Sequence, residues 1–402
     1  MSSWKEFKLV ECIEVINGYA FKSQNFLEEQ IENSLPVVKI KNVANGDVNL
    51  KAVQFHLFDK NLEKYLIQKN DVLIALTGNH PQAITQVVGE ASKYKLDELA
   101  FLNQRVAKIK ARENMSNDFL YYFLKDDASH DYLASQSSGS ANQANISKSD
   151  IENMPISLPP LEEQKAIAEV LSSFDDKIDL LHRQNQTLES LAQTLFRQWF
   201  IEEAKEEWEV GILDDYIDIV DNRGKTPPFL DNETEYPIIE VNALSGQSRL
   251  INYSVIKKYV TEETYNSWFR AGHPRLYDTL LSTVGSIGEI AMFLLEKGSI
   301  AQNVVALRAK NISPFYLYEN IKFMQNELKE LDIGSVQPSI KVTHLVKVDF
   351  VKPDDEILKK FDEQMMSISN KVIINSQQIK TLENLRDTLL PKLLSGEVRV
   401  KI

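Results

Sequence analysis

The sequence is poor in several residue types, and each shortage excludes a class of protein. Its only cysteine is Cys12, so no disulfide can form within the chain. Its 14 glycines and 13 prolines among 402 residues are too few for a fibrous or low-complexity protein. The longest apolar runs, such as Val72–Leu76 and Ile290–Leu295, are far shorter than the roughly 20 residues of a membrane-spanning helix. We therefore expect a cytoplasmic protein with no membrane partner.

Positive charge is scarce as well. The formal net charge is -13, and a protein that coats nucleic acid without sequence preference depends on an excess of lysine and arginine. More than half of the net negative charge lies on two segments, 161–207 and 353–394. The rest of the chain is nearly balanced, so basic faces on otherwise neutral domains remain compatible with the composition.

Catalytic and metal-binding motifs are missing too. The six histidines are scattered without the spacing of metal ligands, and with one cysteine we expect no zinc site. Gly224-Lys225-Thr226 resembles the end of a phosphate-binding loop, but Ile219 stands where its first glycine is required. No Gly-x-Ser-x-Gly nucleophile turn occurs. The sequence therefore predicts a binding protein without a cofactor of its own, not an enzyme.

The strongest pattern present is an internal duplication. Residues 177–200 and 371–394 are identical at eight of 24 aligned positions. Preceding blocks match in the same order: 35–43 with 236–244, 70–78 with 277–285, 101–111 with 299–309, and 139–147 with 334–342. Ordered matches predict two copies of one unit. The predicted parts are a first mixed domain at 1–158, a first long helix at 159–205, a second domain at 206–352, and a second long helix with its tail at 353–402.

Short runs rich in β-branched residues indicate strands within the two domains. They are bounded by glycine, asparagine or proline, and they lie at 36–43, 71–77, 104–109, 237–241, 278–284 and 303–308. The predicted class is α+β.

Each long helix carries an apolar seam with alternating spacings of four and three residues, which is the pattern of a coiled coil. The first seam runs from Ile167 to Trp199 and the second from Leu358 to Leu389. The natural partner of each seam is the other helix. Antiparallel pairing would place the two domains at opposite ends of the pair, related by a pseudo-twofold axis.

Two asparagines interrupt the seams, and a proline follows the second one. Asn185 and Asn375 each occupy a seam position, where a polar residue commonly fixes register. The alternative is that these asparagines mark helix ends. Pro391 should make the second helix kink or end near Leu390, because proline clashes with the preceding turn.

Several short motifs carry a family resemblance. Pro159-Pro160-Leu161-Glu162-Glu163-Gln164 stands before a long coiled helix, the domain-plus-helix unit is duplicated, and Leu-Leu-Ser-Gly-Glu-Val closes the second copy at 393–398. Together these features resemble the specificity (S) subunit of type I restriction–modification systems, over essentially the whole chain. Residues 18–23 and 221–227 look like two common openings of that family's target-recognition domains.

The resemblance implies the function. Each target-recognition domain would read one half of a bipartite double-stranded DNA target, while the helices set the spacer and dock two methyltransferase (M) subunits. Restriction (R) subunits would join that complex. The chain itself would be non-catalytic and would confer specificity on an adenine methyltransferase and a restriction endonuclease. S-adenosylmethionine, ATP and magnesium would be bound by those partner subunits.

Candidate DNA-binding residues lie in loops at matching places of the two copies. Base edges are read by paired donors and acceptors, with Arg or Lys favoured for guanine and Asn or Gln for adenine. In the first copy the candidates are Lys22, Ser23, Thr77, Asn79, Gln82, Gln143 and Asn145. In the second copy they are Arg223, Lys225, Thr226, Ser282, Ser286, Gln337 and Ser339.

Two alternatives stay open at this point. Each candidate could instead be a turn residue whose side chain satisfies nearby backbone groups. The whole chain could also be a non-catalytic protein-binding scaffold with two αβ modules on a coiled coil, which the acidic net charge mildly favours.

Overall fold

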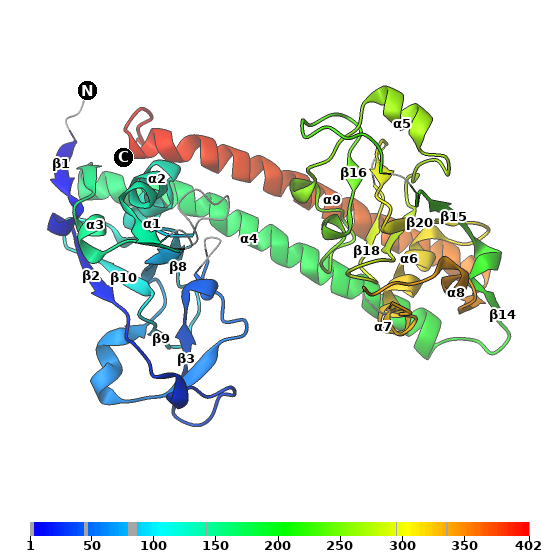
Figure 1. Ribbon diagram of the computed structural model, residues 1–402, viewed down its shortest axis with the longest axis horizontal. Coiled ribbons are helices and arrows are strands. Elements are labelled where there is room, and N and C mark those ends of the chain that lie inside the picture. The colour runs from blue at the N-terminus through cyan, green and yellow to red at the C-terminus, as the bar shows by residue number, and fades with distance from the viewer. Residues whose placement is uncertain are drawn as a thin grey trace. The chain divides into compact units, whose positions relative to one another are not determined.

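A computed structural model describes residues 4–43, 47–78, 87–140, 143–224, 226–294, 296–334 and 337–401. The chain forms two compact units (Figure 1). Unit 1 contains Met1–Lys177 together with Leu382–Ile402, and unit 2 contains Ile178–Thr381. Two long helices, α4 (Leu161–Arg197) and α9 (Asp355–Leu394), contribute to both units. We call the residues before α4 domain 1 and the residues between α4 and α9 domain 2.

Domain 1 is a mixed domain built on antiparallel strands. Its central sheet has the order β2-β10-β6-β8, a second sheet has the order β4-β3-β9-β5, and smaller sheets are β11-β12-β7 and β1-β13. The strands are β1 (Lys5–Lys8), β2 (Ile13–Asn17), β3 (Ser34–Val38), β4 (Gln54–Leu57), β5 (Leu66–Ile67), β6 (Val72–Ala75), β7 (Thr77–Gly78), β8 (Ala91–Lys93), β9 (Ala100–Leu102), β10 (Val106–Ala111), β11 (Ser138–Ser140), β12 (Gln143–Asn145) and β13 (Pro155–Leu158). The helices are α1 (Asn117–Lys125), α2 (Asp127–Gln136) and α3 (Lys148–Glu152).

Domain 2 repeats this plan. Its central sheet β15-β20-β17-β18 corresponds to β2-β10-β6-β8, and its pair β14-β21 corresponds to β1-β13. The strands are β14 (Glu209–Ile212), β15 (Ile217–Asp221), β16 (Ile238–Ile239), β17 (Thr279–Ser282), β18 (Ile290–Met292), β19 (Ser299–Ile300), β20 (Val304–Ala309) and β21 (Asp349–Lys352). The helices are α5 (Glu262–Trp268), α6 (Pro314–Phe323), α7 (Gln325–Glu330) and α8 (Val342–Leu345). The predicted α+β class and the duplication of a mixed domain are confirmed.

The predicted strands are present, but four are shorter than expected: the runs at 71–77 and 278–284 give Val72–Ala75 and Thr279–Ser282, and the other two end in helical turns. The run at 36–43 ends as a strand at Val38 and continues as a tight helical turn over Ile40–Asn42. The run at 237–241 likewise gives only Ile238–Ile239 before a turn over Val241–Ala243. In both copies the strand pairs in parallel with one later neighbour, β3 with β9 and β16 with β19. The apolar run continues past the strand because the turn also packs into the core, where Val43 and Leu244 are buried.

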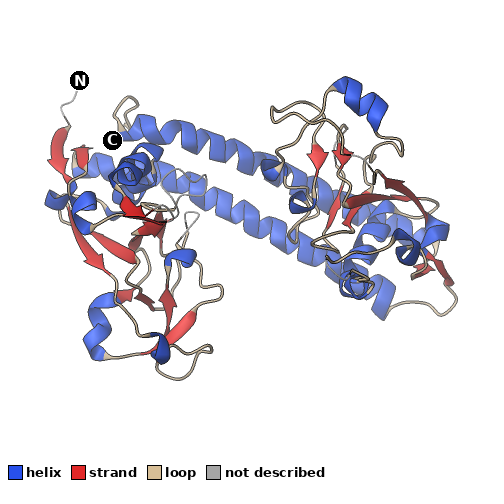
Figure 2. Cartoon of the chain, viewed as in Figure 1, coloured by secondary structure: helices blue, strands red, loops and turns tan. Residues whose placement is uncertain are grey.

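Both long helices begin where the sequence predicts, directly after prolines followed by acidic residues. Proline suits the first turn of a helix because no amide donor is needed there, and acids favour its positive end. Figure 2 shows them as the two longest helices of the chain. At about 1.5 Å per residue, helices of 37 and 40 residues are roughly 55–60 Å long.

The two helices pair in antiparallel fashion in each unit. In unit 1, Ile167 and Leu171 near the start of α4 share a buried cluster with Leu390 and Leu393 at the end of α9. In unit 2, the other ends meet: residues 192–200 share a cluster with residues 358–372. Figure 1 shows each of these helix ends beside its partner within its own unit. The seam positions of both helices are buried or half-buried throughout, so the predicted seam is confirmed.

The two seam asparagines bond to each other inside unit 2. Asn375 Nδ2 donates to Asn185 Oδ1 at 2.8 Å, and Asn185 Nδ2 donates to Ser376 Oγ at 3.3 Å. Asn375 is fully buried, and both residues lie well inside their helices. The alternative that they mark helix ends is wrong. A mutual bond between polar seam residues favours one register, because any slip would leave their amide groups unpaired.

We expected α9 to kink or end near Leu390. It does not end there, because the helix continues to Leu394 with Pro391 inside it. Proline removes one backbone hydrogen bond, but it lies in the last turn of α9, so only three helical residues follow it. Leu390 and Leu393, on either side of it, are buried in unit 1. Their burial stabilises the continued helix.

Candidate nucleic-acid interface

Four segments of domain 1 lie side by side at one edge of its sheets. The opening loop meets the turn at 103–105, where the Gln104 amide donates to the Tyr19 carbonyl at 3.0 Å. That turn meets the end of the central strand, since the Leu76 amide donates to the Arg105 carbonyl at 2.9 Å. The last segment is β12, which pairs with β7. We call these segments, 18–23, 103–105, 76–78 and 143–146, the loop edge of domain 1.

Domain 2 has the same four segments in the same order. Gln302 Nε2 donates to Thr226 Oγ1 at 3.1 Å, which joins the opening loop to the turn at 301–303. The Thr283 amide donates to the Asn303 carbonyl at 2.8 Å, and the Gly285 amide donates to the Pro338 carbonyl at 3.0 Å. We call these segments, 222–224 with 226, 301–303, 283–286 and 337–340, the loop edge of domain 2. Loops predicted separately from the sequence are thus brought together in each copy.

Gly18 is required by the close approach of two of these segments. A Cβ atom built at Gly18 would lie 2.1 Å from the carbonyl oxygen of Asn103, which is backbone and cannot turn aside. The opening loop therefore runs against the 103–105 turn only because residue 18 has no side chain.

Most of the predicted DNA-binding residues are accessible on the loop edges. Lys22, Ser23, Arg223, Thr226, Ser286 and Gln337 are exposed, and Asn145 and Ser339 are half-buried. Asn79, Gln82 and Lys225 lie outside the described residues, as does the side chain of Gln143. These assignments stay predictions.

Two predicted contacts are corrected by burial. Ser282 has no exposed surface; its hydroxyl donates to the Ser286 carbonyl at 2.6 Å and accepts from the Glu289 amide at 2.7 Å. Thr77 is 7% exposed and lies in β7 between its neighbouring segments. Both hydroxyls lie inside their domains, so we withdraw them as base contacts. Ser282 is instead a turn residue whose side chain forms hydrogen bonds with nearby backbone groups, which was the alternative interpretation.

Arg223 already has a partner in its own loop. Its guanidinium forms a bidentate ion pair with Asp221, and its backbone amide also donates to that carboxylate at 3.1 Å. Burial raises the pKa of Asp221, but the hydrogen bonds from Arg223 outweigh it, so the net pKa is lowered. The pair stays charged, and any contact of Arg223 with a phosphate must compete with Asp221.

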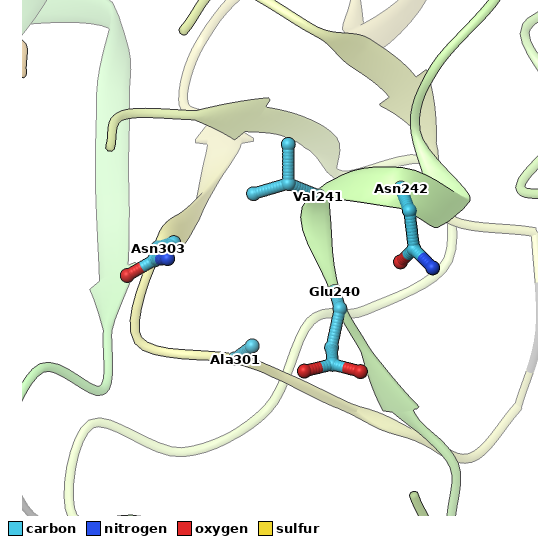
Figure 3. A pocket seen from close by; sticks show the side chains of 5 residues that line it. All are labelled: Glu240, Val241, Asn242, Ala301 and Asn303. Atoms are coloured by element: carbon cyan, nitrogen blue, oxygen red, sulfur yellow. The ribbon is translucent and has the colours of Figure 1, made fainter. Parts of the chain in front are cut away.

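A hollow of about 250 Å³ lies beside the loop edge of domain 2, lined by Glu240, Val241, Asn242, Ala301 and Asn303 (Figure 3). The Glu240 carboxylate in this hollow is paired with a cation, because Lys258 Nζ donates to Glu240 Oε1 at 2.6 Å. The hollow contains amide and carboxylate side chains that can form hydrogen bonds with a ligand. The sequence analysis did not include Asn303 among the candidate site residues. Its position directly after Gln302, which aligns with Gln104 of the first copy, could have indicated it.

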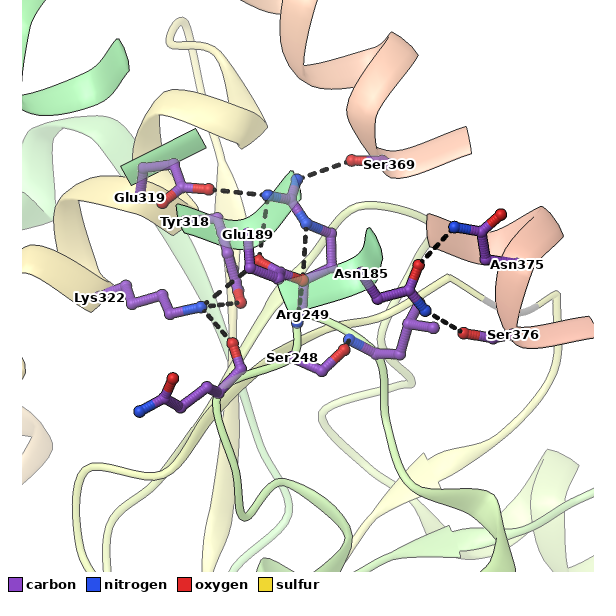
Figure 4. A network of polar contacts seen from close by, with 12 residues as sticks. Asn185, Glu189, Ser248, Arg249, Tyr318, Glu319, Lys322, Ser369, Asn375 and Ser376 are labelled. Atoms are coloured by element: carbon purple, nitrogen blue, oxygen red, sulfur yellow. Dashed lines mark hydrogen bonds and ion pairs between the residues drawn. The ribbon is translucent and has the colours of Figure 1, made fainter. Parts of the chain in front are cut away.

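A buried polar network joins domain 2 to both long helices (Figure 4). The Arg249 side chain is fully buried, and it donates to Glu189 on α4, to Glu319 on α6 at 3.1 Å and to Ser369 on α9 at 2.8 Å. Its backbone amide donates to Glu189 Oε1 at 2.7 Å. Burial raises the pKa of Glu319 to about 7, although Arg249 acts in the opposite direction. No sequence pattern marked Arg249.

Unit 1 has its own polar junction between domain 1 and the helices. Asp175 on α4 accepts from Arg386 on α9 at 2.7 Å and from the Tyr122 hydroxyl of α1 at 2.8 Å. Lys125 of α1 lies 3.8 Å from the same carboxylate. Burial raises the pKa of Asp175, but these cations and hydrogen bonds lower it overall. In both units an acid on α4 thus connects the domain to the helix pair.

The described residues hold no cluster of three or more His, Cys, Asp or Glu side chains that could ligate a metal ion. Within those same ranges, none of the helices has the length and apolar content needed to cross a membrane.

Known proteins resemble this chain in sequence and in fold. The family described as "Type I restriction modification DNA specificity domain" matches residues 1–190 and 205–384. The MjaIX specificity subunit of Methanocaldococcus jannaschii is 25% identical, over 98% of this chain and 97% of that relative. The HindI specificity subunit of Haemophilus influenzae is 23% identical, over 99% of this chain and 100% of that relative.

The fold has a solved counterpart. The crystal structure of a type I restriction–modification system S subunit from M. genitalium aligns with a TM-score of 0.60 at 17% identity, covering 97% of this chain and 96% of that one. With the duplicated domains, the antiparallel helix pair and the family match over both copies, the chain belongs to the type I restriction–modification DNA specificity family.

Proposed function

We propose that each domain reads one half of a bipartite double-stranded DNA target through its loop edge. The observation that carries the proposal is that the two copies arrange the same four segments in the same order while their exposed side chains differ. A shared scaffold with different polar side chains is what recognition of two different half-sites requires, because base edges are distinguished by donor and acceptor pattern. Lys22 in domain 1 and Thr226 and Gln337 in domain 2 are exposed there.

The paired helices have two roles in this proposal: they set the spacer between the half-sites, and they dock two M subunits. Large exposed apolar side chains outside the seam support a docking role, because surfaces that bind other proteins commonly present such side chains. On α4 and α9 they are Leu180, Leu191, Met366, Ile374 and Leu385. R subunits would join the same complex. The chain supplies no reacting group, and S-adenosylmethionine, ATP and magnesium belong to the partner subunits.

The reading function is tested by expressing the chain with its cognate M subunits and sequencing the methylated positions of the host genome. We expect methylation at one bipartite motif with a fixed spacer. Methylation that needs the chain but follows no motif would contradict the proposal. Binding of M subunits with no DNA preference would favour the protein-binding scaffold instead.

The spacer role has a separate test in a matched deletion. Removing residues 176–182 together with 378–384 takes one heptad from each helix and preserves the Asn185–Asn375 and Asp175–Arg386 pairs. The helix pair becomes about 10 Å shorter, which is about three base pairs at 3.4 Å each. We expect a spacer shortened accordingly, or loss of activity where the shorter spacing is incompatible with the DNA helical turn. Deletion of 176–182 alone is the control, since it breaks the register. An unchanged spacer after the paired deletion would refute this role.

A further inference from the structure

Three positions around the hollow of domain 2 have equivalents of different charge in domain 1. The residue after the parallel strand is Glu240 in one copy and Lys39 in the other, because the strands β16 and β3 occupy the same place in their sheets. Two residues further on, Asn242 is replaced by Lys41. The third pair is Asn303 and Arg105.

The equivalence of Arg105 and Asn303 is geometric as well as sequential. The carbonyl of each accepts from the amide that follows the central strand, at 2.9 Å from Leu76 and at 2.8 Å from Thr283. Each follows a glutamine whose segment contacts the opening loop. Both side chains are exposed on their loop edge.

Three of the four side chains in the other two pairs are already engaged within their own domains. Lys39 Nζ donates to Gln54 Oε1 at 2.5 Å, and Lys41 Nζ donates to the Ala52 carbonyl at 2.6 Å. Glu240 accepts from Lys258. These contacts tie Lys39, Lys41 and Glu240 to neighbouring segments of their own domains. Arg105 and Asn303 each carry an exposed side chain on a turn that contacts both the opening loop and the end of the central strand.

The hydrogen-bonding groups of Arg105 and Asn303 differ in the same way as the edges of guanine and adenine that they could bind. A guanidinium offers a planar fork of donors that matches the O6 and N7 acceptors of guanine, and a carboxamide offers one donor and one acceptor that match N6 and N7 of adenine. Resting on the proposed function, we propose that residue 105 of domain 1 and residue 303 of domain 2 are equivalent specificity positions, with Arg105 reading a guanine in one half-site and Asn303 an adenine in the other.

The test exchanges the two side chains in the full chain with its M subunits. Arg105→Asn should lower the preference for a guanine at one position of one half-site by between about 5-fold and 150-fold, the range of one bidentate base contact. Asn303→Arg should alter one adenine position in the other half-site and leave the first half unchanged. Arg105→Lys keeps the charge without the fork, so it should lose discrimination as well. Binding to defined duplexes and sequencing of methylated genomic positions both report these changes.

The matched control is Lys110→Asn, which removes an exposed cation from the far end of β10, the strand that begins directly after Arg105. It should leave the motif unchanged. An unchanged motif in Arg105→Asn would overturn the proposal. So would a uniform loss of affinity for all sequences with a salt slope reduced by about one, because that is the signature of a phosphate contact. If the wild-type chain directs methylation to no bipartite motif, the proposed function fails first and is distinguished from failure of this inference.

Discussion

Replacement of Arg249 by methionine should strongly destabilise unit 2. The side chain is 0% exposed and is bonded to two carboxylates that are themselves almost fully buried, on Glu189 and Glu319. Removing the cation leaves two acids facing one another in the interior. Removing one partner from a buried ion pair typically costs about 3–5 kcal/mol. For a unit of roughly 200 residues, this corresponds to a melting temperature lower by about 6–20 °C.

The loss of stability in Arg249→Met should depend on pH. Glu319 has a folded pKa of about 7, above the value of 4.5 from which burial raises it. A raised carboxyl pKa contributes stability that is fully present below the unfolded pKa and is lost as pH rises through the folded pKa. Without Arg249 the folded pKa rises further, so the deficit of the variant should be larger at pH 8 than at pH 6. Glu319→Gln in the same background should recover part of it.

Urea unfolding followed by tryptophan fluorescence measures this effect, because three of the four tryptophans, Trp199, Trp208 and Trp268, lie in unit 2. Arg223→Met is the matched control. It breaks a partly exposed ion pair in the same domain, and such pairs contribute only about 0–1 kcal/mol. A loss below about 1 kcal/mol for Arg249→Met, or equal losses in the two variants, would refute the reasoning.

Three further perturbations probe the seam, the core and the loop edge. Asn375→Leu should cost about 1–3 kcal/mol because it leaves the side-chain oxygen of Asn185 without its donor, whereas leucine at both positions should be neutral or stabilising; a double-mutant cycle of unfolding free energies checks this. Phe361→Ala removes a fully buried ring and should cost about 3–5 kcal/mol in the same assay. Gly18→Ala should reduce DNA discrimination by domain 1 and lower its melting temperature, since the added methyl group overlaps a backbone oxygen; a variant that melts and binds like the wild type would contradict that placement.

The sequence predicted those features that repeat along the chain. The seam from Ile167 to Trp199 and its counterpart in α9 follow a fixed spacing, and both helix starts follow proline and acids, so local pattern suffices for them. The pairing of the helices also followed, because no other apolar seam of that length exists in the sequence.

Features that depend on contacts between distant segments could not be predicted in the same way. Arg249 lies in a polar stretch of loop residues, and only the meeting of α4, α6 and α9 around it makes it a buried residue. Ser282 is the last residue of β17 and resembles a loop residue in the sequence, yet its hydroxyl closes the turn that ends at Glu289. Arg105 stands beside an aligned glutamine, but its place at the centre of the loop edge emerges only when the opening loop packs against it.

The ends of α4 and α9 that meet in unit 1 are made at very different times during synthesis. Leu390 and Leu393 complete the core that Ile167 and Leu171 begin, and Arg386 binds Asp175. At about 5–20 residues per second, a ribosome adds the intervening stretch of roughly 200 residues in about 10–40 s. During that delay the nascent first half exposes the apolar face that α9 later covers, so the core of unit 1 is completed only after domain 2 and α9 have been made, even though domain 1 emerges first.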